Sequence, residues 1–337
     1  MTSNYNEVGV RQCLVTGGAG FIGSHLAERL VADGHRVRIL DNMITGRAEN
    51  LSEISGHASL ELLEGDIRDK SVVEAACNGV DWVFHLAGMA DVVPSVENPS
   101  PYFETNVDGT FNLLDAARSS GVERFVYAAS SSCYGLVEER PTTESAPIKV
   151  EYPYALTKLL GEQLVLHWGQ VYGLPVVSLR LFNVFGPRAR TQGSYGSVLG
   201  VFLRQKLGGM PFTLVGDGTQ SRDFVYVTDV ANAFACAADS TARDVVINIG
   251  AGQPQTVNRL VELLDGPVIN VPKRPGEPDC THADISRAAE LLDWRPEISF
   301  EEGISLVLAR ITEWSDAPLW TKEKVAEATR AWFDAIS

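Results

Sequence analysis

The chain has 337 residues, a formal net charge of −15 and 45% hydrophobic residues. This length predicts about two domains, and the acidic charge argues against nucleic acid or an anionic membrane as a partner. The five cysteines form no CxxC pair, the six histidines show no metal-ligand spacing, and no apolar run approaches membrane-spanning length. We therefore expect a cytoplasmic protein with reduced thiols, no signal peptide and no metal.

A glycine-rich stretch at residues 15–23 follows an apolar run and leads into a helical pattern at residues 24–31. Gly17 allows a tight bend, Gly20 lets the backbone approach a pyrophosphate, and Gly23 lets the helix pack closely on the strand. The helix N-terminus adds unpaired N–H groups and a partial positive charge. Glycines also serve ordinary loops, but this position between strand and helix predicts a dinucleotide-binding turn.

Asp41 and Asn42 end the next apolar run, about 20 residues after the glycine turn. A carboxylate at this position accepts hydrogen bonds from both ribose hydroxyls of adenosine and repels a 2′-phosphate. Asp41 therefore predicts NAD rather than NADP as the cofactor; the alternative is an ordinary turn residue.

Short apolar runs alternate with helical patterns, which predicts an α/β fold with a doubly wound, Rossmann-type parallel sheet. The predicted strands are residues 12–15, 37–40, 60–63, 82–86, 124–129, 176–181 and, returning late to the sheet, 245–249. Residues 1–186 and 224–250 would form this cofactor domain, and residues 187–223 and 251–337 a smaller, discontinuous substrate domain. A substrate would lie in the cleft between the domains.

Three further features belong to the predicted sheet. Asp66 and Ile67 follow the third strand, where they could hold an adenine; Ile67 could equally be core, and Asp66 could cap the helix that begins near Lys70. Leu86 and Ala87 lie at the end of the fourth strand, where we expect them beside the cofactor because small residues there leave room for it, whereas we expect His85 to be structural. Residues 101–118 predict a helix, with Gly109 as a close-packing point, that covers the sheet or pairs with a second subunit.

The chemistry is predicted between residues 130 and 158. The fifth strand ends at Ser130, and a later helix carries Tyr154 and Lys158, which are four residues apart and share a helical face. A free tyrosine has a pKa of about 10, and a neighbouring ammonium or a cationic nicotinamide favours the phenolate. Tyr154 is therefore a candidate base, Lys158 can also donate to the nicotinamide ribose, and a serine hydroxyl can share the proton.

These motifs resemble the extended short-chain dehydrogenase/reductases, and within them the nucleotide-sugar epimerases of the UDP-glucose 4-epimerase type. The resemblance continues through residues 180–188, 216–229 and 274–277 and spans nearly the whole chain. It implies Ser130 as the catalytic hydroxyl, Tyr154 as acid/base, Lys158 as its support and Ser131 at the sugar. It also implies a homodimer and places further residues beside NAD, namely Phe21, Ile22, Thr45 and Gly46.

The same resemblance implies how the substrate is held. Phe182 and Asn183 would contact it, with Asn183 at the diphosphate, and Arg222 and Arg274 would bind the nucleotide phosphates. Glu277 would reach a ribose hydroxyl, and Arg188 is a further substrate candidate. The alternative for each arginine is a solvated surface ion pair.

Differences from related enzymes narrow the implied reaction. Ser131 and Ser132 stand where related 4,6-dehydratases carry an Asp-Glu pair, so dehydration is disfavoured. Cys133 lies one residue away from the cysteine position of the 3,5-epimerising relatives and is expected in the core. Thr281 stands where some relatives have a large aromatic, so a 2-acetamido sugar would fit.

The implied function is NAD-dependent epimerisation at C4 of a nucleotide-sugar, UDP-glucose/galactose or UDP-GlcNAc/GalNAc, through a 4-keto intermediate. The alternatives are a 4-reductase, a dehydratase, an epimerase at another carbon, or a non-catalytic NAD-binding protein. Residues 314–337 extend past the usual last helix and predict an amphipathic helix after Thr321, packed on its own domain.

Overall fold

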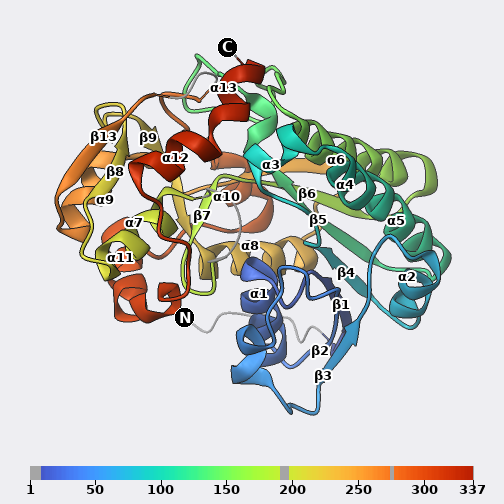
Figure 1. Ribbon diagram of the computed structural model, residues 1–337. Coiled ribbons are helices and arrows are strands. Elements are labelled where there is room, and N and C mark those ends of the chain that lie inside the picture. Colours follow the sequence, from blue (N-terminus) through green and yellow to red (C-terminus); the bar gives the residue numbers. More distant parts are fainter. Residues whose placement is uncertain (1–8, 190–196, 274–276, 337) are drawn as a thin grey trace, which may run out of the picture.

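The structure is a computed structural model that describes residues 9–189, 197–273 and 277–336 (Figure 1). Its central feature is a parallel seven-stranded sheet in the order β11-β6-β5-β4-β1-β2-β3. This order confirms the predicted Rossmann-type sheet and the late return of residues 245–249. The strands are β1 (Gln12–Thr16), β2 (Arg36–Asp41), β3 (Leu60–Glu64), β4 (Trp82–His85), β5 (Arg124–Ser130), β6 (Val176–Leu181) and β11 (Val245–Ile249).

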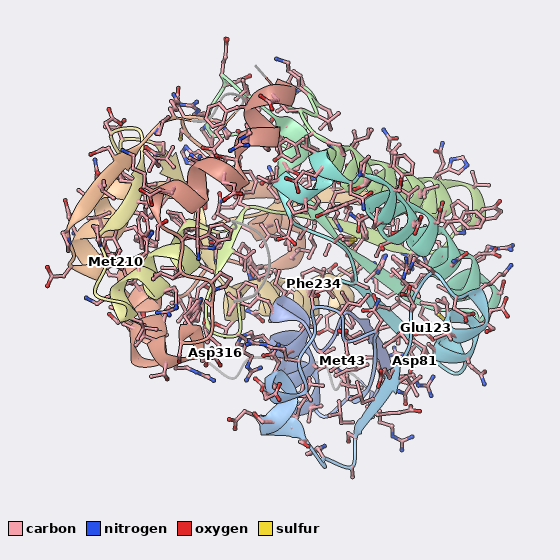
Figure 2. All side chains as sticks on the ribbon, viewed as in Figure 1. Met43, Asp81, Glu123, Met210, Phe234 and Asp316 are labelled. Carbon is pink, nitrogen blue, oxygen red and sulfur yellow. The ribbon has the colours of Figure 1, made fainter. Side chains whose placement is uncertain are left out.

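Helices cover both faces of this sheet. Successive strand residues alternate between two buried clusters, with Val15 and Ile39 in one and Leu14 and Leu40 in the other, as expected of strands buried on both faces. The first cluster packs under α1 (Phe21–Ala32), α8 (Val227–Asp239) and α10 (Ser286–Leu292). The second packs under α2 (Lys70–Cys77), α5 (Gly109–Ser119) and α6 (Pro153–Tyr172). In Figure 2 the buried Phe234 of α8 lies near the middle of the molecule.

The remainder of the chain forms a smaller body beside the sheet (Figure 1). Its buried cluster includes Phe202, Leu260 and Trp314. Its helices are α7 (Val198–Leu207), α9 (Val257–Leu264), α11 (Phe300–Ala309) and η4 (Ile311–Trp314). Its short strands pair as β7 (Asn183–Phe185) with β10 (Phe224–Tyr226), β9 (Ser221–Arg222) with β12 (Gln255–Thr256), and β8 (Phe212–Val215) with β13 (Val268–Val271). The division into domains by residue number stays a prediction.

The helix expected at residues 101–118 is built in three consecutive pieces, α4 (Ser100–Phe103), the π-helical η2 (Glu104–Asp108) and α5. Its apolar side chains divide, because Leu113 is fully buried whereas Phe103 and Phe111 are 42% and 44% exposed. A Cβ added at Gly109 would lie 2.6 Å from Ile67 Cδ1, which confirms Gly109 as a close-packing point. The other helices are η1 (Ala48–Ile54), α3 (Val92–Glu97), η3 (Ser131–Tyr134), α12 (Lys322–Ala328) and α13 (Arg330–Ile336).

The C-terminal extension differs from its prediction in one respect. Thr321 caps α12 as expected, and α12 packs through Val325 on the cluster of the smaller body. A second helix, α13, then contacts α3 of the sheet-bearing part. The extension therefore spans both parts of the molecule. Among the described residues, no helix is long and apolar enough to cross a membrane.

Candidate active site

The glycine turn closes tightly against neighbouring strands. Gly17 has φ +69°, and a Cβ there would lie 2.7 Å from Ala87 N, while a Cβ at Gly23 would lie 2.2 Å from Gly17 O. Gly20 caps α1 without a side-chain hydrogen bond, so the first amides of the helix keep no side-chain partner at the cap. A cradle that only glycines can form, at a helix N-terminus, fits the phosphates of a dinucleotide.

Asp41 lies beside this turn, at the carboxyl end of β2. Its carboxylate accepts hydrogen bonds from Ala19 N at 3.0 Å and Met43 N at 2.9 Å. Burial raises the pKa of Asp41, and the two amides oppose that shift. A Cβ at Gly46 would lie 2.6 Å from Asp41 Oδ1, so Gly46 leaves room around the carboxylate, whereas Thr45 is exposed next to it.

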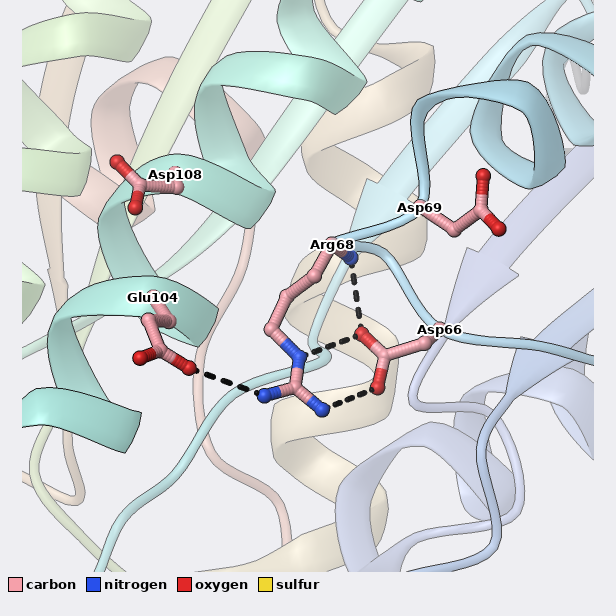
Figure 3. A pocket seen from close by; sticks show the side chains of 5 residues that line it. All are labelled: Asp66, Arg68, Asp69, Glu104 and Asp108. Atoms are coloured by element: carbon pink, nitrogen blue, oxygen red, sulfur yellow. Dashed lines mark hydrogen bonds and ion pairs between the residues drawn. The ribbon is translucent and has the colours of Figure 1, made fainter.

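Asp66 lies at a cavity of about 530 Å³ lined by Asp66, Arg68, Asp69, Glu104 and Asp108 (Figure 3). Arg68 donates to both oxygens of Asp66, from Nε at 3.0 Å and Nη2 at 2.9 Å, and Asn42 Nδ2 donates to Oδ2 at 2.9 Å. The Arg68 side chain, above all, holds the pKa of Asp66 at about 2. Asp66 is not the cap of α2, because Asp69 accepts from Ser71 N and Val72 N there.

Two residues at the strand ends, Ile67 and His85, have side chains that are mainly structural. Ile67 is 4% exposed and belongs to the core beneath α5. His85 is fully buried between the hydroxyls of Thr16 and Thr110, at 2.8 and 2.9 Å, and burial lowers its pKa to about 3. His85 is therefore a neutral structural histidine, as expected, while Leu86 stays half-buried at the strand end.

Ser130, Tyr154 and Lys158 come together at the carboxyl edge of the sheet. Ser130 ends β5, and its side chain acts on the Tyr154 phenol, whose pKa it lowers against the effect of burial. Lys158 follows Tyr154 by one turn of α6 and is 7% exposed, with Nζ 4.4 Å from the centre of the Tyr127 ring. A Cβ at Gly88 would lie 3.8 Å from this amine. The amine is thus next to the segment that touches Gly17.

Burial controls the ionisation of both candidate groups. It raises the pKa of Tyr154, opposed by the Ser130 hydroxyl, and it lowers the pKa of Lys158 from 10.5 to about 7, opposed by Glu162. The sequence predicted that Lys158 would lower the pKa of Tyr154. The protein alone does not do so, because a buried amine with a pKa near 7 is only partly charged at neutral pH.

The candidate substrate residues form two groups. Asn183 Oδ1 accepts from Thr281 Oγ1 at 2.9 Å, and that hydroxyl accepts from Asp223 N at 3.0 Å. Arg222 and Glu277 both act on the pKa of Tyr152, which burial raises, so they lie within electrostatic range of that phenol. Asn183 and Thr281 thus touch each other, and Arg222 and Glu277 lie near Tyr152, the ring that stacks on Tyr154.

The remaining candidates lie differently. Phe182 is 7% exposed and packs with Cys133, which is buried as expected. Arg188 forms an ion pair with Glu28 of α1, Nη2 to Oε1 at 2.6 Å, and its side chain is 6% exposed, so it is not a solvated surface pair. Ser131 begins η3 directly after Ser130. Arg274 lies outside the described residues.

Two features of the site had no counterpart in the sequence prediction. Glu162 binds Arg180 in a buried ion pair, with Arg180 Nη2 2.6 Å from Glu162 Oε1. Glu162 follows Lys158 by one turn of α6, and this spacing could have indicated a carboxylate near the amine. Tyr152 stacks on Tyr154, with ring centres 6.4 Å apart and planes at 10°. No local sequence pattern indicates the surroundings of Tyr152 as a whole, because most of them come from distant parts of the chain.

Comparisons with known proteins agree with this geometry. A model of the NAD dependent epimerase/dehydratase family matches residues 13–250. The UDP-glucose 4-epimerase of Mycolicibacterium smegmatis is 36% identical over 301 residues, which cover 87% of this chain and 96% of that protein. The UDP-N-acetyl-alpha-D-glucosaminuronate decarboxylase of Bacillus cytotoxicus is 34% identical over 311 residues, covering 87% and 95%.

Solved structures give the same result. The UDP-N-acetylglucosamine 4-epimerase from Methanobrevibacter ruminantium, in complex with UDP-N-acetylmuramic acid, matches with a TM-score of 0.84 at 34% identity, covering 89% of this chain and 99% of that chain. The UDP-glucose 4-epimerase of Thermus thermophilus, in complex with NAD, matches with a TM-score of 0.80 at 37% identity, covering 89% and 98%.

Proposed function

The chain belongs to the NAD-dependent epimerase/dehydratase family, its cofactor is NAD, and from this premise we propose that it is a UDP-sugar 4-epimerase. The observation that carries the proposal is the convergence of Ser130, at the end of β5, with Tyr154 and the buried amine of Lys158 on α6. In this arrangement Tyr154 is the group that we assign to proton transfer. The arrangement suits oxidation and reduction at a single carbon.

We assign the cofactor to the glycine turn and its neighbours. Gly17, Gly20 and Gly23 receive the pyrophosphate at the start of α1, and Asp41 receives the adenosine ribose. NAD supplies the site with a group that takes up and returns hydride. The side chains of the protein bind it, orient it and handle the proton.

Tyr154 takes the proton from the sugar 4-hydroxyl and later returns it, which leaves a bound 4-keto sugar between the two steps. We assign Ser130 to share this proton, because its side chain acts on the phenol. Lys158 donates to the nicotinamide ribose. Because burial opposes ionisation of Tyr154, the Ser130 hydroxyl and the positive charge of the oxidised cofactor are the influences that favour the phenolate.

The substrate is anchored away from the reacting carbon, so that the sugar can turn while its diphosphate stays bound. Asn183 and Arg222 take the diphosphate and Glu277 a ribose hydroxyl. The Thr281 hydroxyl is engaged with Asn183, and its small side chain leaves space for a 2-acetamido group. We therefore include UDP-GlcNAc and UDP-GalNAc among the substrates.

The test is conversion of UDP-glucose and UDP-GlcNAc, followed by NMR, in wild type and Tyr154→Phe. We expect the variant to lose nearly all turnover while keeping bound NAD, because Tyr154 acts on the proton and the cofactor contacts are elsewhere. Tyr172→Phe, an exposed tyrosine at the far end of α6, is the matched control. Retained turnover in Tyr154→Phe would remove this residue from its proposed role.

A second candidate is decarboxylation, because relatives at similar identity carry that name. Both reactions start by oxidation at C4, so the same assay with UDP-glucuronic acid separates them. Loss of carbon dioxide from this substrate, with no epimerisation of neutral sugars, would favour the decarboxylase.

We also propose a homodimer through α4, α5 and α6. Phe103 and Phe111 are 42% and 44% exposed, and Val171 and Tyr172 at the end of α6 are 53% and 50% exposed. Aromatic side chains at this density are typical of interfaces. Light scattering on the purified protein should give twice the mass of the chain.

A further inference from the structure

Three aromatic rings form a row that leads from the C-terminal helix to the candidate base. Trp332 of α13 is 4% exposed, and its ring centre lies 5.4 Å from that of Tyr152, with planes at 51°. Tyr152 in turn stacks on Tyr154. We call Trp332, Tyr152 and Tyr154 the aromatic row. Its far end is about 180 residues away in sequence from the near end.

The helix that carries Trp332 is fixed at both ends of its path. Gln205 Nε2 donates to Trp320 O at 2.7 Å, and Val325 is buried in the cluster of the smaller body, so the segment before α13 is attached there. α13 itself packs on α3, at the top of Figure 1. Ser95 of α3 accepts a hydrogen bond from Tyr154 N at 3.1 Å. α13 is thus connected to Tyr154 in two indirect ways, through the ring of Tyr152 and through its packing on α3.

Tyr152 also faces the substrate side. Glu277 and Arg222 act on the pKa of its phenol, as does Tyr154. Removing the ring of Trp332 would therefore free a side chain that stacks on the candidate base and lies within electrostatic range of Arg222 and Glu277. The aromatic row is part of the wall of the site and not a remote packing contact.

We propose that Trp332 is a positioning residue, which holds Tyr152 against Tyr154 and so fixes the phenol toward the sugar hydroxyl. This inference rests on the proposed function. In the matches with the two solved structures, 98–99% of the solved chain is covered and 89% of this chain. The aromatic row gives α13 a role in the reaction.

The experiment is a double-mutant cycle on the full chain with bound NAD. Trp332→Ala and Tyr152→Ala should each lower kcat about tenfold, the factor that one aromatic pair contact represents, with little change in KM because the diphosphate contacts remain. If Trp332 acts through Tyr152, the double variant loses no more than either single variant. Trp332→Phe keeps a ring and should stay close to wild type. Multiplying losses in the double variant would overturn the proposal.

Val325→Ala is the matched control, because it removes buried apolar volume from the same extension without touching the aromatic row. It should lower the thermal midpoint but leave kcat unchanged. An equal loss of kcat in Val325→Ala would show that general loosening of the extension is the cause, against our proposal. Trp332→Leu, which keeps apolar bulk, replaces Trp332→Ala if that variant does not fold.

Hydrogen exchange of the amides at residues 152–158 gives a readout that does not need turnover. Exchange should become about tenfold faster in Trp332→Ala and Tyr152→Ala and stay unchanged in Val325→Ala. If wild type epimerises no UDP-sugar, the proposed function fails while exchange still decides the role of Trp332. Unchanged exchange in Trp332→Ala would remove that role even in an active enzyme.

Discussion

The buried amine of Lys158 should make the stability of the NAD-free protein depend on pH in a defined direction. Burial lowers the pKa of Lys158 from 10.5 to about 7, with Glu162 as the opposing charge. Between these two values the unfolded chain binds one more proton than the folded one, so the free energy of unfolding rises with pH. The slope is ~1.4 kcal/mol per pH unit. Over the whole window the rise is on the order of 5 kcal/mol.

The assay compares wild type with Lys158→Met by guanidinium denaturation between about pH 6 and 10. Other titrating groups are common to both proteins and cancel in the difference. Near the lower limit wild type should be the less stable protein, and this deficit should shrink steadily above pH 7. Parallel stability curves would refute the reasoning, because they would mean that Lys158 keeps an ordinary pKa in the folded protein.

Saturating NAD provides a second arm of the same experiment. If Lys158 donates to the nicotinamide ribose as proposed, binding favours the ammonium and the rise in stability begins at higher pH. If the rise in stability began at the same pH with and without NAD, Lys158 would not contact the cofactor, although it would still be buried.

Two further substitutions test the turn and the buried ion pair. Gly23→Ala places a Cβ 2.2 Å from Gly17 O, so the turn must open and the purified protein should carry little NAD. The NAD content is measured by chromatography of the released nucleotide, and a normal content would contradict the prediction. Arg180→Met leaves the buried carboxylate of Glu162 without its partner and should cost roughly 3–5 kcal/mol in denaturant, most of which Glu162→Gln in the same chain should restore. If Arg180→Met were as stable as wild type, the carboxylate of Glu162 would be compensated without Arg180, and the prediction would be wrong.

Local sequence determined the frame of this protein. Short apolar runs that alternate with helical patterns predicted each strand of the large sheet to within a residue or two, because such runs have few other stable arrangements. The glycine turn followed in the same way, since the left-handed φ of Gly17 and the close approach at Gly23 exclude side chains. The cap of α2 was left open by the sequence, where Asp66 was one alternative. The structure assigns the cap to Asp69, whose carboxylate accepts from Ser71 N and Val72 N.

Tertiary structure decided everything that depends on a distant neighbour or on burial. The pKa of Lys158 is lowered because α6 packs it beneath Tyr127, which no spacing reveals. Arg188 turns to Glu28 and Tyr152 packs on Trp332, through contacts that join residues more than 150 positions apart in the sequence. Sequence patterns encode the hydrophobic periodicity of a helix or strand and the residue types that its turns require. Which charges lose water and which rings meet is set only when the elements pack.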